Sequence, residues 1–273
     1  MPGSLARLPR PALLAMVHVG ALPGTPGSCA GVAELARQAA DEAKLLSDHG
    51  VDGIVLENMH DVPYLRGRVG PEVIAAMTAI CLAARQATAL PLGVQVLAGA
   101  NRAALAVALA AGLQFIRAEN FVFAHVADEG LMPVADAGRL MRYRRAIGAE
   151  SIAVLADIKK KHAAHALTAD VSLAETATAA EFFGAAGVVV TGSATGRPAD
   201  PAEVRTVRET VRGFVAVGSG VTPDNLADFA PHADAMIVGS WFKRDGAWHQ
   251  PPDAARLRRL VEAFGAVRGN IQR

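Results

Sequence analysis

The sequence predicts a single (β/α)8 barrel of the α/β class that spans residues 1–273. Short apolar runs of strand length alternate eight times with helical segments along the chain. Strands of four to eight apolar residues between helices are typical of a parallel sheet covered on both faces. Eight units at a spacing of roughly thirty residues favour a closed barrel over an open doubly wound sheet. A Rossmann fold is disfavoured because the turn after the first run lacks the GxGxxG spacing and contains Pro23.

Each predicted element rests on its pattern and its boundary residues. The β-branched and apolar runs predict strands at 13–19, 53–57, 92–97, 114–119, 152–158, 188–191, 214–221 and 235–240. The helical patterns cover 32–48, 71–86, 102–110, 136–147, 173–183, 201–211 and 252–264, and a further helix starts within 222–225. Residues 1–10 form an N-terminal extension. The loop 121–134 is longer than an ordinary βα loop, so we expect either a lid or aromatic contacts with a neighbouring subunit.

Composition excludes several classes of function. Lys+Arg 27 against Asp+Glu 26 leaves a net charge of +1, so neither nucleic acid nor a membrane surface is an expected partner. Cys29 and Cys81 are far apart, which favours a reduced, cytoplasmic setting. The apolar run 11–17 is too short for a signal peptide and is needed as the first strand, and no stretch has transmembrane length. An apolar content of 52% leads us to expect a homo-oligomer.

Two strand ends late in the chain indicate a phosphate site. The runs 214–221 and 235–240 both end in Gly and Ser, and glycine lets backbone N–H groups approach a ligand closely. The loops after the seventh and eighth strands form the phosphate site of many (β/α)8 barrels. Ordinary glycine-rich turns are the alternative, and a flexible turn is the alternative for the similar stretch 191–196. The residues expected to bind phosphate are Gly218, Ser219, Gly220, Gly239 and Ser240, with Thr191 and Gly192.

Polar side chains at the other strand ends predict a catalytic centre. The strand period of two places an acid on the same barrel-facing row as apolar residues in three strands, ending at Glu57, Glu119 and Asp157. Burying ionised groups is costly unless they are paired, so we favour function over a purely structural ion-pair network. Glu57 and Asp157 are expected to act as general base and acid, or to hold a divalent cation jointly, and His18 suits either role. The expected substrate contacts are Asn58, Gln95 and Arg117.

The lysine run 159–161 follows Asp157 and is the densest group of candidates. Lys159 or Lys161 is expected to stabilise an oxyanion or enolate, and a Schiff base is an alternative that requires a depressed lysine pKa. Three successive lysines also resemble a solvated loop, so at least one should have no role in the site. The remaining histidines lack the spacing of a zinc site. We therefore predict no fixed metal site and no redox cofactor, and leave a divalent metal cofactor open.

The combined motifs resemble the BtpA/SgcQ family over nearly the whole chain. They are Met16-Val17-His18 with Leu22-Pro23-Gly24, Glu57-Asn58 with Asp61-Val62-Pro63, Phe115-Ile116-Arg117 with Asp128-Glu129-Gly130, Tyr143-Arg144-Arg145, Asp157 with Lys161-His162, Thr191-Gly192 with Thr195-Gly196, Gly218-Ser219-Gly220 and Ile237-Val238-Gly239. The resemblance implies a TIM barrel in a family linked to photosystem I biogenesis and, in other members, to sugar metabolism. Two features depart from its pattern: Glu119 in place of a polar amide, and an extra lysine before Lys161.

The leading functional hypothesis is an enzyme that acts on a small phosphorylated metabolite, either a sugar phosphate or a nucleoside phosphate. Isomerase or lyase chemistry fits the set of acids, bases and lysines without a redox cofactor. A non-catalytic assembly or regulatory protein, as the family name suggests, is the second hypothesis. A metal-dependent hydrolase that uses His18, Glu57 and Asp157 is the third.

Overall fold

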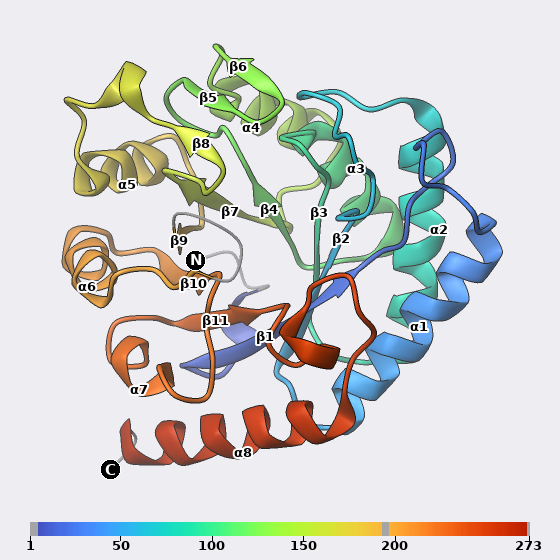
Figure 1. Ribbon diagram of the computed structural model, residues 1–273. Helices are drawn as coiled ribbons and strands as arrows, with labels where there is room; N and C mark the ends of the chain where they lie inside the picture. The colour runs from blue at the N-terminus through green and yellow to red at the C-terminus, as the bar shows by residue number, and fades with distance from the viewer. Residues whose placement is uncertain (1–4, 193–196, 272–273) are drawn as a thin grey trace.

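Eight parallel strands close into a barrel in the computed structural model, which describes residues 5–192 and 197–271 (Figure 1). The barrel strands are β1 (Ala12–His18), β2 (Gly53–Glu57), β3 (Leu92–Gln95), β4 (Phe115–Ala118), β7 (Ala153–Ile158), β9 (Gly187–Thr191), β10 (Phe214–Gly218) and β11 (Ala235–Val238). Around the barrel they follow the order β1-β11-β10-β9-β7-β4-β3-β2. The predicted single (β/α)8 barrel is confirmed.

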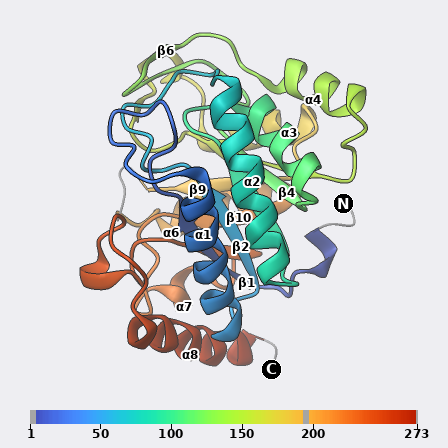
Figure 2. The same cartoon turned by 90° about the vertical axis from the view of Figure 1, so that its right-hand side faces the viewer.

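A helix follows every barrel strand and covers its outer face. The helices are α1 (Val32–Asp48), α2 (Pro71–Ala87), α3 (Asn101–Ala111), α4 (Ala137–Ala146), α5 (Leu173–Phe182), α6 (Pro201–Thr210), α7 (Leu226–Phe229) and α8 (Ala254–Ile271). Figure 2 shows α1 and α2 lying side by side on one flank. The helix predicted after 222–225 is only the short α7, whereas the predicted last helix extends beyond 264 to Ile271. No helix in the described ranges is both long and apolar enough to cross a membrane.

Local sequence signals set several helix starts. Pro71 and Pro201 each occupy the first turn of a helix, where the missing N–H would have no intrahelical partner. Asp200 caps α6, because its Oδ1 accepts a hydrogen bond of 2.8 Å from the amide of Ala202. Ser172 and Glu175 form a reciprocal capping box at the start of α5. These caps fix where each chain segment leaves the barrel mouth.

The alternation of side chains along the strands produces two separate cores. One row, which includes Leu14, Val55 and Leu155, packs inside the barrel, and the other row packs between the barrel and the helices. Phe115 fills the centre of the barrel directly opposite Gly93, where a Cβ atom would lie 2.2 Å from the ring. The inner rows are apolar toward the N-terminal ends of the strands. Polar side chains of these rows therefore lie at the carboxyl ends of the strands, which form the mouth of the barrel.

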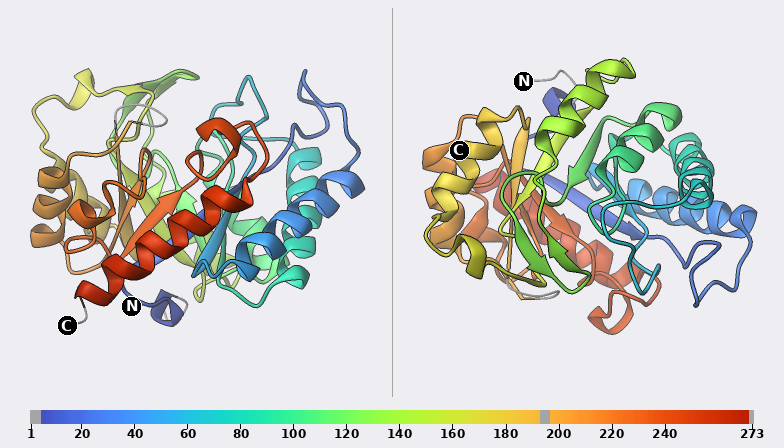
Figure 3. Two further views of the ribbon diagram at one scale, coloured as in Figure 1. Left: turned by 60° about the horizontal axis from the view of Figure 1, so that its bottom comes forward. Right: turned by 90° about the horizontal axis from the view of Figure 1, so that it is seen from above.

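The N-terminal extension closes the bottom of the barrel. Residues Leu5–Arg7 form a short 3-10 helix, and Leu5 and Leu8 are buried in the inner core with Phe214. Both leucines therefore exclude water from the end of the barrel opposite the mouth. Figure 3 shows this segment at the far end from the long loops.

A second, three-stranded sheet stands at the mouth. It is built from β5 (His125–Ala127) and β6 (Gly130–Met132) of the long loop after β4, and β8 (Ala163–Ala164) of the loop after β7, in the order β6-β5-β8. Phe121 is fully buried within the same chain, whereas Phe123 is 36% exposed. The segment 121–134 is thus a hairpin tied to a neighbouring loop, and its movement as a lid remains a prediction. Short 3-10 helices at Ala166–Thr168 and Arg244–Gly246 complete the loops.

The contact between Gly93 and Phe115 gives a test of the inner core. Gly93→Val should lower the free energy of unfolding by about 1–3 kcal/mol or more, because the added carbons overlap a ring that cannot move outward. Gly265→Ala is the control, since a Cβ atom at this α8 position meets nothing within 4 Å and alanine favours a helix. Urea unfolding of both variants measures the difference. Equal stabilities would show that the barrel interior is not packed as described.

Candidate functional site

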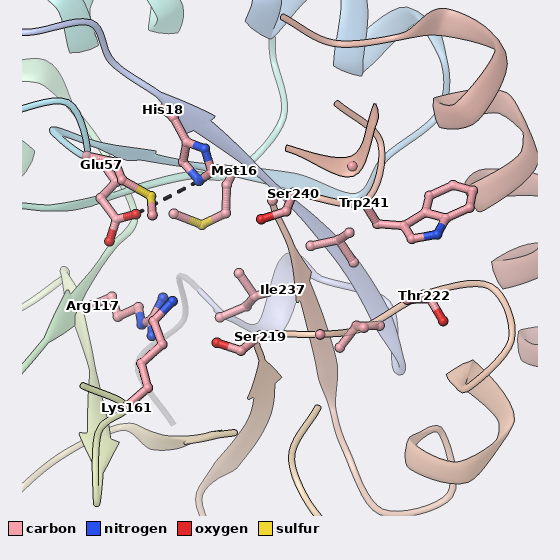
Figure 4. Close-up of a pocket in the computed structure, with 16 residues that line it drawn as sticks. Met16, His18, Glu57, Arg117, Lys161, Ser219, Thr222, Ile237, Ser240 and Trp241 are labelled. Atoms are coloured by element: carbon pink, nitrogen blue, oxygen red, sulfur yellow. Dashed lines mark ion pairs between the residues drawn. The ribbon is translucent and has the colours of Figure 1, made fainter. Parts of the chain in front are cut away.

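The candidate site is a pocket of about 140 Å³ at the carboxyl ends of the strands (Figure 4). His18 and Glu57 enter it from β1 and β2, and Arg117 enters from β4. Lys161 comes from the loop after β7. Much of the remaining wall is formed by the chain following β10 and β11, at residues 219–222 and 239–241. We call this space the first chamber.

A second chamber of about 280 Å³ adjoins the first. Both chambers are lined by Glu57, Met59, Arg117 and Lys161, so they are two halves of one mouth. The second chamber lies beneath the hairpin and carries more charge. Its other lining residues are Tyr64, Gln95, Leu97, Glu119, Asp128, Glu129, Lys160, His162 and Trp248.

Arg117 and Asp157 form a buried, two-pronged ion pair between β4 and β7. The Arg117 Nε and Nη2 atoms donate to the two Asp157 carboxylate oxygens at 2.8 and 2.9 Å, and the side chains are 6% and 1% exposed. Burial works against the charge of the guanidinium, but Asp157 outweighs it and raises the pKa of Arg117. Because both oxygens of Asp157 are occupied by Arg117, the carboxylate positions the arginine.

His18 and Glu57 face each other across the floor of the first chamber. His18 Nε2 lies 4.0 Å from Glu57 Oε2, and both side chains are buried (Figure 4). Burial and the charge of Lys243 lower the pKa of His18 to about 3, so the imidazole is neutral near pH 7. Its Nδ1 lies 2.9 Å from the Trp248 carbonyl, which can only accept. The proton therefore resides on Nδ1, and Nε2 presents a lone pair to the chamber.

The pKa of Glu57 shifts in the opposite direction from that of His18. Burial raises its pKa, while Arg117 and Lys161 act against the shift. The neutral imidazole thus offers a proton acceptor 4.0 Å from a carboxyl group that retains its proton to a higher pH than usual. A base and an acid at this separation can remove and return a proton on a ligand held between them.

The three successive lysines have three different environments. The strand ends at Ile158 and Lys159 adopts a left-handed backbone with φ of 46°, so the alternation that predicted Lys159 on the inner row stops before it. The Lys159 ammonium donates to the Val171 carbonyl and lines neither chamber. Lys160 is buried, with its Nζ 3.2 Å from Glu119 Oε1. Only Lys161 lines both chambers.

The surroundings of Lys160 and Lys161 shift the pKa values of these two lysines in opposite directions. Burial works against the charge of Lys160, but Glu119 and Glu129 outweigh it and raise its pKa. Burial and the nearby guanidinium of Arg117 lower the pKa of Lys161. The two departures from the family pattern, Glu119 and the extended lysine run, thus meet in one ion pair.

The turns after β10 and β11 present unused backbone donors. The amides of Ser219, Gly220, Gly239 and Ser240 donate to no residue that the structure describes, and all four residues line the first chamber. The Ser219 hydroxyl is buried and likewise has no partner among the described residues. Ser219 and Gly220 both have positive φ, which turns this backbone sharply over the mouth.

Glycine is required at two of these positions by close contacts. A Cβ atom on Gly239 would lie 2.9 Å from His18 Nε2, and one on Gly220 would lie 2.2 Å from the backbone of Pro198. At Gly218 the nearest atoms to an added Cβ are 3.5 to 3.9 Å away, and they include Arg117 Nη2. A small side chain at 218 would therefore fit the fold and project toward Arg117.

The other predicted binding residues lie at the edge of the site. Thr191 Oγ1 accepts a hydrogen bond of 3.2 Å from the backbone amide of Lys161, and so supports the lysine loop. Gly192 packs against the carbonyl of Arg197 and lines neither chamber. The following residues 193–196 lie outside the described ranges.

Asn58 and Gln95 have different surroundings. Asn58 accepts from the amide of Leu97 and donates to Asp61, so it ties the loops after β2 and β3 together instead of facing the mouth. Gln95 lines the second chamber, and its role as a substrate contact stays a prediction.

His18, Glu57 and Asp157 are not clustered in a way that would let them bind one metal ion together. Among the residues that the structure describes, no cluster of three or more His, Cys, Asp or Glu side chains could hold a metal ion. Asp157 is engaged with Arg117, as described above.

Several residues of the site escaped the sequence analysis. Trp248 comes from the loop between β11 and α8, which folds back so that its carbonyl orients His18. Tyr64 lies on a loop that lines the second chamber, and so does Glu129, which the sequence analysis named only within the motif 128–130 and not as a site residue. The length of the loop 239–253 was an available signal, but nothing in the sequence indicated which residue would return to the mouth.

Comparison with known proteins identifies close sequence relatives. The BtpA family profile matches residues 10–266. An uncharacterised mitochondrial protein of Caenorhabditis elegans is 44% identical over 95% of each chain. The photosystem I biogenesis protein BtpA of Synechocystis is 32% identical over 92% of this chain and 87% of its own.

Solved structures with the same fold are more distant in sequence. (S)-3-O-geranylgeranylglyceryl phosphate synthase from Thermoplasma acidophilum, in complex with its substrate sn-glycerol-1-phosphate, matches with a TM-score of 0.59, 16% identity and 96% coverage of each chain. Phosphoribosyl anthranilate isomerase from Thermus thermophilus matches with a TM-score of 0.57 and 16% identity, over 94% of this chain and 99% of its own. At these identities the likeness concerns the fold.

The neutral state of His18 predicts a specific pH dependence of stability. Above pH 6.5 the imidazole is neutral in both folded and unfolded chains and contributes nothing. As the pH falls from 6.5 toward about 3, the unfolded chain binds a proton that the folded chain does not, so this group lowers the free energy of unfolding. The slope from one such proton is at most about 1.4 kcal/mol per pH unit.

His18→Asn removes this term while its amide can still donate to the Trp248 carbonyl. Urea unfolding between pH 7 and pH 4 should therefore show the wild type losing stability faster than the variant as the pH falls. Parallel profiles for the two proteins would mean that His18 titrates as an ordinary histidine.

Proposed function

Because the chain belongs to the BtpA family and folds as a (β/α)8 barrel, we propose that it is an enzyme that binds a small phosphorylated metabolite and moves a proton on it. The observation that carries this proposal is the arrangement of the first chamber. Unused backbone donors after β10 and β11 share it with Arg117 and Lys161, and His18 and Glu57 lie at its floor. This combination suits a sugar phosphate or nucleoside phosphate and an isomerase or lyase reaction.

The phosphate is assigned to the turns after β10 and β11. Backbone N–H groups without other acceptors bind phosphate oxygens well, and glycine at 220 and 239 leaves room for close approach. Arg117 and Lys161 supply positive charge on the same chamber. Two structural neighbours, by their names, also act on phosphorylated compounds, which supports the same assignment at the level of the fold.

Proton transfer is assigned to His18 and Glu57. The lone pair of His18 Nε2 accepts a proton from the carbon next to a carbonyl group, and the carboxyl group of Glu57, whose pKa is raised by burial, returns one. The cationic Lys161 and Arg117 stabilise the enolate oxygen that forms in between. Asp157, expected from the sequence to transfer a proton, is assigned the positioning of Arg117 instead, because both its oxygens are bound there.

The lowered pKa of Lys161 favours a second role for this residue. A neutral amine can attack a substrate carbonyl and form a Schiff base, which is the chemistry of many lyases. Borohydride reduction in the presence of a carbonyl-containing substrate, followed by mass spectrometry of the peptide that contains Lys161, separates the two roles. A trapped adduct assigns Lys161 as a nucleophile, and its absence leaves the electrostatic role.

An assembly function is the second candidate, and one surface feature favours it. Phe182 and Phe183, at the end of α5, are 84% and 51% exposed and their rings contact each other. Such a pair suits a homo-oligomeric contact or a protein partner. It lies apart from both chambers, so it is compatible with the proposed enzyme.

Gly218→Val tests the phosphate assignment. Wild-type protein should show a thermal shift with inorganic phosphate or a sugar phosphate, equivalent to about 2.7 kcal/mol at a hundred times Kd. Gly218 lines neither chamber, but a Cβ atom at this position would lie 3.9 Å from Arg117 Nη2. The methyl groups of valine reach further and should displace the guanidinium, so the variant should lose the shift. Gly31→Val is the control, because a Cβ atom there meets nothing within 4 Å, whereas one at 218 approaches Arg117. A shift retained by Gly218→Val would contradict the assignment.

Glu57→Gln tests the proton transfer once a turned-over substrate is known. The amide keeps the shape of the carboxyl group but cannot supply its proton, so kcat should fall by roughly 10²- to 10⁴-fold. The Kd for inorganic phosphate, measured by calorimetry, should stay within about twofold, because Glu57 contacts the reacting carbon and not the phosphate. An unchanged kcat would remove Glu57 from the mechanism.

A further inference from the structure

The second chamber contains an unusual concentration of unfilled hydrogen-bond acceptors. In the described part of the chain, Gln95 Oε1, Glu119 Oε2 and Glu129 Oε2 are buried and have no hydrogen-bond donor. All three residues line this chamber. Gln95 is 2% exposed, and the side chains of Glu119 and Glu129 are 8% and 10% exposed. A buried acceptor without a donor costs roughly 1–3 kcal/mol, so three in one chamber require an explanation.

Lys160 holds the two carboxylates in place without filling these acceptors. Its Nζ lies 3.2 Å from Glu119 Oε1, which leaves Glu119 Oε2 unused. Glu129 Oε2 lies 3.8 Å from the same ammonium, close enough for attraction but beyond a hydrogen bond. The lysine therefore offsets part of the negative charge of the two carboxylates, and each carboxylate keeps an oxygen that can still accept a hydrogen bond.

This arrangement selects the chemistry of the ligand. Three acceptors call for a group with several donors, and three cations, Arg117, Lys160 and Lys161, already line the chamber, so the group that fits both conditions needs no charge of its own. Neutral hydroxyl groups meet both conditions. The residues shared by the two chambers include Glu57 and Lys161, so a ligand that spans both would place its central carbon atoms at the proposed proton-transfer groups.

We propose that the second chamber is a hydroxyl-recognition subsite, in which Gln95, Glu119 and Glu129 bind the hydroxyl groups of a polyhydroxylated ligand. The proposal rests on the proposed function, since the same ligand carries the phosphate held in the first chamber. It narrows the substrate class to a polyol or sugar monophosphate that retains neighbouring free hydroxyl groups, and it makes Gln95 and Glu129 specificity-determining residues.

The test compares phosphates with and without hydroxyl groups by calorimetry. The probes are inorganic phosphate, n-butyl phosphate and a panel of pentose and hexose monophosphates. At least one sugar phosphate should bind wild-type protein about tenfold or more tightly than n-butyl phosphate, because hydrogen bonds to charged acceptors are among the stronger ones. Gln95→Leu and Glu129→Gln should each reduce that advantage by about tenfold and leave the Kd of n-butyl phosphate unchanged.

Gln95→Leu also separates recognition from a structural role. Gln95 makes no side-chain hydrogen bond to a described residue, so replacing its unsatisfied amide by an apolar side chain should leave the free energy of unfolding equal or higher. A purely structural glutamine would give lower stability and unchanged ligand affinity. Gln86→Leu is the matched control, because Gln86 is exposed at the end of α2 and lines neither chamber.

The outcomes distinguish this proposal from the proposed function. If n-butyl phosphate binds as tightly as every sugar phosphate, or if the advantage of the sugars survives both substitutions, the hydroxyl subsite is overturned while the phosphate site stands. If neither inorganic phosphate nor n-butyl phosphate binds, the phosphate site fails. Binding of free pentoses and hexoses then tests the hydroxyl subsite. Sugar binding that is lost in Gln95→Leu supports the subsite, and the absence of sugar binding overturns it.

Discussion

The buried pair of Arg117 and Asp157 is the interaction on which the organisation of the barrel mouth depends. Moving a charge out of water costs several kcal/mol, and only a well-placed partner offsets this. The two-pronged geometry between β4 and β7 provides that partner and fixes the guanidinium over the interior of the barrel. With Arg117 in place, a second cation on Lys161 experiences repulsion, and Glu57 experiences attraction that opposes its burial. Arg117 thus contributes to the lowered pKa of Lys161 and opposes the rise in the pKa of Glu57.

The closed barrel determines which residues meet. Parallel strands end at the same rim, and their inner rows are apolar until the last residues of each strand, so the polar residues of the inner rows gather at this rim. Backbone donors come from a different source, the residues that directly follow β10 and β11. The hairpin β5–β6 and the loop that carries Trp248 cover this space from opposite sides. Two chambers of different character result, one rich in backbone donors and the other rich in side-chain acceptors.

The sequence predicted the fold and the inner rows because both depend on local periodicity. Glu57, Arg117 and Asp157 lie where alternation along their strands placed them, and the BtpA family assignment is confirmed. Periodicity fails where a strand ends, which is why Lys159, with its left-handed backbone, points away from the mouth. The pairing of Lys160 with Glu119 joins two loops distant in sequence, and no local pattern contains that information. The same holds for the contact of the Trp248 carbonyl with His18.

The central claim is that the turns after β10 and β11 bind phosphate, and the most direct test is a crystal structure of the protein with inorganic phosphate or tungstate. We predict an anion within hydrogen-bond distance of the amides of Ser219, Gly220, Gly239 and Ser240, with Arg117 or Lys161 on its other side. The groove between α2 and α4 offers a competing site, since Arg68, Arg102 and Arg139 line it. An anion bound only in that groove, with the first chamber empty at saturating concentration, would contradict the account.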